Sequence, residues 1–79
     1  MSDPVLTAIR RSVLEVLPDL DPELVTEDRS LSDLGANSID RAEVVTLTME
    51  DLGISVPVGD FREVHDIGSL ALLLRRHVG

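Results

Sequence analysis

The chain has 79 residues, no Cys, a single aromatic residue (Phe61) and a formal net charge of −8, from 7 Lys and Arg against 15 Asp and Glu. Without Cys it can form neither a disulfide nor a zinc–thiolate site. Its acidity and lack of aromatics disfavour binding to nucleic acid or anionic membranes, and favour partners with basic patches. We expect one small cytoplasmic domain spanning residues 1–79, with no signal peptide and no membrane span.

The first predicted helix covers about residues 4–17. Asp3 is a suitable N-cap, and Pro4 suits the first helical position, because the N–H that proline lacks would have no helical partner there. Pro18 then ends the helix. Apolar residues at helical spacing predict a stripe that faces the core: Leu6, Ile9, Val13 and Val16, with Leu17 beside it.

An acidic segment without sustained periodicity follows at residues 18–37. Structureless loops of this length are uncommon in compact domains, so we expect its own apolar side chains to fix it to the core. These side chains are Leu20, Leu24, Val25, Leu31 and Leu34. A short turn is predicted at Pro22–Val25, and Gly35 allows backbone conformations that other residues resist.

The second predicted helix covers residues 38–52, with Asn37 as N-cap, Asp40 in the first turn and Gly53 as the stop. Its apolar residues are spread around most of the circumference, whereas a helix on a small core needs only one stripe. Two interpretations remain open. Either some of these residues face water or a partner, or the helix is central and contacts elements on two sides.

The remaining sequence predicts a short helix at about residues 60–64 and a last helix at 67–77, capped by Asp66. Phe61 is expected to anchor the short helix to the core. The last helix has a core-facing set of Leu70, Leu73 and Leu74. The fold class is therefore all-α: a four-helix bundle of three main helices and one short helix, with a long first loop.

Ser38 stands at the start of the second helix, within the run Leu31–Asp40 (Leu-Ser-Asp-Leu-Gly-Ala-Asn-Ser-Ile-Asp) that precedes Glu43–Val45. This run resembles the acyl carrier proteins of fatty-acid and polyketide synthesis, whose signature is Leu-Gly-x-Asp-Ser-Leu before an amphipathic helix. The similarity continues through Gly53–Pro57 to Gly68–Leu70, and the first helix fits the same plan. The resemblance implies an acyl-carrier-like four-helix bundle.

The resemblance also implies that Ser38 carries 4′-phosphopantetheine, attached from coenzyme A by a phosphopantetheinyl transferase. The cofactor's thiol would hold acyl groups as thioesters for polyketide or fatty-acid biosynthesis. The chain would be a non-catalytic monomer that partner enzymes act on: a ketosynthase or decarboxylase and an acyltransferase. By the same analogy, the partner-docking residues would be Asn37, Ile39, Asp40, Arg41, Ala42, Glu43, Thr46, Met49 and Glu50.

Three positions depart from the family pattern. Asn37 stands where most relatives have Asp, Ile39 replaces the usual Leu, and Arg41 adds a positive charge where relatives are commonly neutral. The combination looks like the small discrete carriers of polyketide β-branching cassettes. In those systems a donor carrier presents an acetyl group to an enzyme similar to hydroxymethylglutaryl synthase.

The same residues allow other interpretations. Ser38 followed by Ile39 does not fit G-x-S-x-G, which disfavours a serine hydrolase. His65 and His77 are isolated and lack metal-ligand spacing, so neither a metal site nor a catalytic residue is expected. The remaining alternatives to an acyl carrier are a peptidyl or other carrier, disfavoured by Ala36 and Asn37 before the serine, and an unmodified helical interaction module.

Overall fold

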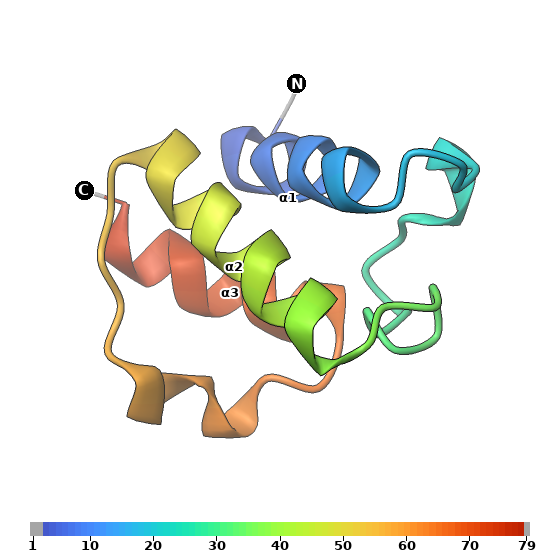
Figure 1. Cartoon of the computed structure of the whole chain (residues 1–79). Coiled ribbons are helices and arrows are strands. Elements are labelled where there is room, and N and C mark those ends of the chain that lie inside the picture. Colours follow the sequence, from blue (N-terminus) through green and yellow to red (C-terminus); the bar gives the residue numbers. More distant parts are fainter. Residues whose placement is uncertain (1–2, 79) are drawn as a thin grey trace.

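The computed structural model describes residues 3–78, and every regular element in that range is a helix (Figure 1). The elements are α1 (Pro4–Val16), the 3₁₀ turn η1 (Pro22–Leu24), α2 (Ser38–Leu52), the 3₁₀ helix η2 (Val58–Glu63) and α3 (Ile67–His77). The prediction of three main helices, one short helix and a long first loop is confirmed. Met1, Ser2 and Gly79, the ends of the predicted 1–79 domain, lie outside the described residues.

The bounds of two predicted helices differ from the structure. The first helix ends at Val16, and Leu17 has left the helical region (φ −121°, ψ 73°) because the residue before a proline is disfavoured there. The short helix begins at Val58, two residues earlier than expected, and is a 3₁₀ helix. The carbonyl of Pro57 accepts a 3.0 Å hydrogen bond from the N–H of Asp60 and so starts the turn.

Carboxylate and amide caps begin the three α-helices as the sequence predicts. The Asp3 carboxylate accepts hydrogen bonds from the N–H groups of Val5 and Leu6, and Asp66 caps α3 through the N–H of Ser69 at 2.7 Å. The Ser69 hydroxyl and amide lower the pKa of Asp66, and a hydrogen bond from Arg75 lowers the pKa of Asp3. Both carboxylates therefore cap their helices in the charged form, which suits a helix N-terminus.

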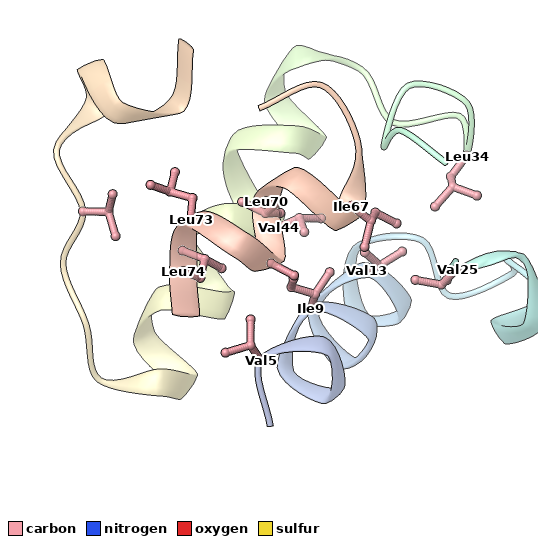
Figure 2. Packing of buried hydrophobic residues seen from close by; sticks show 12 residues of the cluster. Val5, Ile9, Val13, Val25, Leu34, Val44, Ile67, Leu70, Leu73 and Leu74 are labelled. Carbon is pink, nitrogen blue, oxygen red and sulfur yellow. The ribbon is translucent and has the colours of Figure 1, made fainter. Parts of the chain in front are cut away.

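The core lies where α1, α2 and α3 meet, and consists almost entirely of Val, Leu and Ile side chains (Figure 2). Ile9 and Val13 of α1 are fully buried, as predicted. Val5 is also buried, whereas Leu6 and Val16, which the sequence placed in the stripe, are only partly covered. The buried stripe is therefore Val5, Ile9 and Val13 at i, i+4 and i+8, because α1 is rotated slightly from the expected orientation.

The long first loop is fixed both by apolar side chains and by its backbone. Val25 and Leu34 are buried, but Leu24, which was expected to pack on the core, is 38% exposed. The loop carbonyls of Arg29 and Glu27 accept hydrogen bonds from the first N–H groups of α3, at Ile67 and Gly68. These N–H groups have no acceptor within their own helix, so the loop carbonyls supply the hydrogen bonds that the start of α3 needs.

Gly68 gives a stability test of this loop–helix contact. Replacing a helical glycine by alanine usually stabilises a helix by about 0.5–1 kcal/mol. A Cβ at Gly68, however, would lie 3.1 Å from the carbonyl oxygen of Glu27. We expect Gly68→Ala to lower the free energy of unfolding by about 1 kcal/mol in urea denaturation, because the crowding outweighs the helix preference.

Gly59→Ala is the matched control, because a Cβ there would meet nothing within 4 Å and no positive φ is required. This variant should be neutral or more stable by about 0.5 kcal/mol. A Gly68→Ala variant as stable as Gly59→Ala would show that the loop yields to the methyl group and does not limit the position of α3.

Candidate functional site

Ser38 is the first residue of α2, and its side chain is exposed. The helix start is satisfied by its neighbours: the Asn37 side-chain oxygen accepts from the N–H of Asp40 at 2.8 Å, and the Asp40 carboxylate accepts from the N–H of Asn37 at 3.2 Å. Within residues 3–78 no hydrogen bond engages the Ser38 hydroxyl. The capping box therefore leaves this hydroxyl free at a fixed position.

A largely apolar groove of about 460 Å³ lies beside α2. One wall is α2 itself, and the other wall comes from the segment around η2 and the start of α3. Ser30 and Ser32, from the loop before α2, lie at the edge. The apolar lining residues are Leu31, Ala42, Val45, Met49, Val56, Val58, Phe61, Val64 and Leu70.

Ser38 is not one of the lining residues, but it lies one helical turn before a row of α2 side chains that lines this groove. Ala42, Val45 and Met49 follow it at i+4, i+7 and i+11, spacings that place all four residues on one side of an α-helix. A group attached to the Ser38 hydroxyl therefore starts about one helical turn from the lining residues of α2, on the same side of the helix. The volume falls within the range of small-molecule sites.

The groove was not predicted from the sequence. The available signal was the spread of apolar residues around α2, and the structure agrees with each interpretation in part, because the helix covers the core on one side whereas Ile39 is 75% exposed. Val44 and Thr48 are buried on the core side, while Val45 and Met49 line the groove. Phe61, expected as a core anchor, is half-buried and lines the groove as well.

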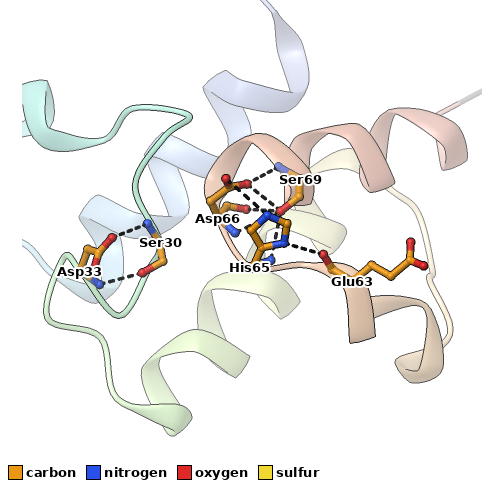
Figure 3. A network of polar contacts seen from close by, with 6 residues as sticks. All are labelled: Ser30, Asp33, Glu63, His65, Asp66 and Ser69. Atoms are coloured by element: carbon orange, nitrogen blue, oxygen red, sulfur yellow. Dashed lines mark hydrogen bonds and ion pairs between the residues drawn. The ribbon is translucent and has the colours of Figure 1, made fainter.

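Two hydrogen-bonded turns border the groove (Figure 3). Ser30 and Asp33 bond reciprocally: the Ser30 N–H donates to the Asp33 carboxylate at 3.1 Å, and the Asp33 N–H donates to the Ser30 hydroxyl at 3.0 Å. Near the start of α3, Asp66 accepts from Ser69, and Nδ1 of His65 lies 2.9 Å from the carbonyl oxygen of Glu63. Ser30, His65 and Asp66 are lining residues, so these turns fix the edges.

The nine residues expected to dock partners are divided between two sides of α2. Ile39, which is 75% exposed, lies with Glu43, Thr46 and Glu50 at i+4, i+7 and i+11 on an exposed side. The other members are either part of the cap or part of the groove wall: Asn37 and Asp40 form the capping box, and Arg41, Ala42, Thr46 and Met49 line the groove. Thr46 thus belongs to both sides.

Within residues 3–78, no group of three or more His, Asp or Glu side chains could hold a metal ion. His65 and His77 each approach one carboxylate, Asp66 and Asp60 respectively, at 3.8 Å. No helix in the same range is both long and apolar enough to cross a membrane.

Residues 6–74 match the family model described as the phosphopantetheine attachment site. The chain belongs to this family of carrier proteins. It is 41% identical to the polyketide biosynthesis acyl-carrier protein AcpK of Bacillus subtilis over 63 residues, which cover 80% of this chain and 77% of AcpK. It is 38% identical over 80 residues to the acyl carrier protein of Phenylobacterium zucineum, covering 100% of this chain and 99% of the relative.

The acyl carrier protein of Caulobacter vibrioides is 41% identical to this carrier over 69 residues, 86% of each chain. No solved structure matches the carrier significantly. The chain is therefore an acyl carrier protein: non-catalytic, with 4′-phosphopantetheine as its prosthetic group. It depends on a phosphopantetheinyl transferase to attach that group and on biosynthetic enzymes to load and use it. The exposed Ser38 hydroxyl, free of internal hydrogen bonds and one helical turn from the lining of an apolar groove, fits this prosthetic group.

Proposed function

We propose that Ser38 is the attachment residue and that this carrier holds acyl groups as thioesters for polyketide biosynthesis. The observation that supports it is the free, exposed Ser38 hydroxyl, held by a capping box that uses only Asn37 and Asp40. In the attachment step, Ser38 Oγ forms a phosphodiester with the phosphopantetheine part of coenzyme A, the nucleotide part leaves, and the hydroxyl proton is lost. The bound group supplies the thiol that the chain itself, with no Cys, lacks.

The similarity to AcpK supports polyketide biosynthesis rather than fatty-acid biosynthesis as the pathway. Within it, we place the chain as an acetyl-donor carrier in β-branching, on the Asn-Ser-Ile-Asp-Arg-Ala-Glu run at residues 37–43. Its partners would then be a ketosynthase or decarboxylase, an acyltransferase and a hydroxymethylglutaryl-synthase-like enzyme. We propose that it works as a cytoplasmic monomer, because weak and fast encounters with several enzymes suit a delivery role.

The groove is the site proposed for the acyl chain. Ser38 lies one helical turn before Ala42, Val45 and Met49 of its wall and on the same side of α2, so an arm folded back along α2 brings its cargo to an apolar surface. Burial of the chain there would remove about 0.8 kcal/mol of unfavourable hydration per CH₂ group. It would also shield the cargo from solvent between enzymes.

The attachment proposal is tested by intact mass. Co-expression with a phosphopantetheinyl transferase should add one phosphopantetheine to the wild-type chain and none to Ser38→Ala. Ser38 is exposed and makes no internal hydrogen bond, so the alanine variant should keep its unfolding free energy within about 0.5 kcal/mol. Ser32→Ala is the matched control and should remain modified. An unmodified wild-type chain with several transferases would contradict the proposal and favour the interaction module.

The docking proposal is tested with the acetylated holo-protein and a synthase of the hydroxymethylglutaryl type. Charge reversal at Glu43 or Glu50 should lower kcat/KM about three- to tenfold at low salt, because exposed carboxylates steer a basic partner surface. Glu15→Arg, an exposed position on α1, should have a smaller effect. A wild-type carrier used only by a modular ketosynthase would exclude the β-branching role, and variants that lose helicity would mark Glu43 and Glu50 as structural.

The groove proposal is tested by thermal unfolding of holo and octanoyl forms. The octanoyl group should raise the midpoint of the wild-type protein by about 5 °C or more, because its CH₂ groups become buried. Ala42→Phe fills the groove from α2 and should abolish this increase, whereas Glu43→Phe, outside the lining set, should preserve it. An equal increase in both variants would place the acyl chain elsewhere.

A further inference from the structure

Arg41 is the single basic residue of α2, and the other charged residues of this helix are all Asp or Glu. Its Nη1 donates a 2.9 Å hydrogen bond to the Ser32 hydroxyl. Within residues 3–78 no carboxylate lies in ion-pair distance of the Arg41 guanidinium, although the chain has 15 acidic residues. A guanidinium has five N–H donors, so most of the donors of Arg41, and its charge, are left without a partner in the described structure.

Helix geometry directs the Arg41 side chain toward the turn of α2 that holds Ser38. Arg41 is at i+3 from Ser38, a spacing at which side chains are neighbours on the helix surface. Long helical side chains lean toward the N-terminus of their helix. The hydrogen bond to Ser32 joins the Arg41 side chain to the loop that leads into α2. Arg41 also lines the groove, so its charge lies on the same side of α2 as the row that follows Ser38.

The two capping-box residues beside Ser38 provide no competing cation. Asn37 is uncharged, and the Asp40 carboxylate is turned back to accept from the N–H of Asn37. A phosphodiester on Ser38 would add a full negative charge to a chain of net charge −8. The planar fork of an arginine matches phosphate oxygens and binds them through two parallel hydrogen bonds.

We propose that Arg41 is the phosphate-binding residue of this carrier, an inference that rests on attachment at Ser38. In the apo protein Arg41 is held by the Ser32 hydroxyl; in the holo protein its guanidinium binds the phosphodiester. The arm then leaves Ser38 along the groove side of α2. Ser32 thus keeps the guanidinium next to the attachment site before the phosphate arrives.

A cycle of modification and substitution tests this contact in the intact protein. The unfolding equilibrium constant is measured by urea denaturation for apo and holo forms of wild type, Arg41→Gln and the control Arg62→Gln, an exposed arginine on η2. Modification should lower the unfolding equilibrium constant about two- to fivefold more in wild type and Arg62→Gln than in Arg41→Gln. The difference should diminish at 1 M salt. Equal effects of modification in wild type and Arg41→Gln would overturn the proposal.

Nuclear magnetic resonance separates phosphate binding from a role that only joins loop and helix. Modification should shift the Arg41 Nε–H signal. In the holo protein, Arg41→Gln should shift the phosphodiester ³¹P resonance, and Arg62→Gln should not. Ser32→Ala removes the apo partner and should leave the ³¹P resonance of the holo protein at its wild-type position. A ³¹P resonance unmoved by Arg41→Gln would make Arg41 a loop contact alone.

The failure of this inference is distinguishable from the failure of attachment. A holo mass without coupling to Arg41 would overturn only the phosphate contact. An unmodified chain would overturn attachment at Ser38 and the phosphate contact together.

Discussion

The capping box between Asn37 and Asp40 is the contact on which the site depends, because it determines where α2 begins. Helix starts present N–H groups that need acceptors, and a serine at such a position would ordinarily supply one. Here the neighbouring residues supply the acceptors. Ser38 therefore occupies the first helical position with its side chain exposed, held rigidly by a helix that contributes to the core.

The second constraint is the double role of α2. Val44 and Thr48 are fully buried on its core side, where the Thr48 hydroxyl donates to the Val44 carbonyl at 2.7 Å. Val45 and Met49 meet the groove on another side. A helix that covers both a core and a groove cannot have a single apolar stripe. In a chain with one aromatic residue, few bulky side chains are available to fill the space beside α2, which is consistent with a groove there.

Charge is distributed around α2 in a pattern that suits a carrier. Its exposed side presents Glu43 and Glu50, which favour association with basic surfaces, while Arg41 lies on the groove side. The family relationship makes this chain an acyl carrier. Its own departures from the family pattern, Asn37 and Arg41, both make the surroundings of Ser38 less negative. Both changes favour a phosphodiester at that position, which links the sequence departures to the proposed phosphate contact.

The sequence by itself determined the helix order, the caps at Asp3, Asn37 and Asp66, and the motif around Ser38, because capping and helical periodicity are local properties. It did not determine the rotation of α1, the exposure of Leu24 or the 3₁₀ start at Val58, which depend on what each segment packs against. The groove likewise exists only after η2 and α3 are placed opposite α2. A cavity is a property of the space between elements, so the tertiary structure alone decided that one lies along the side of α2 that begins at Ser38.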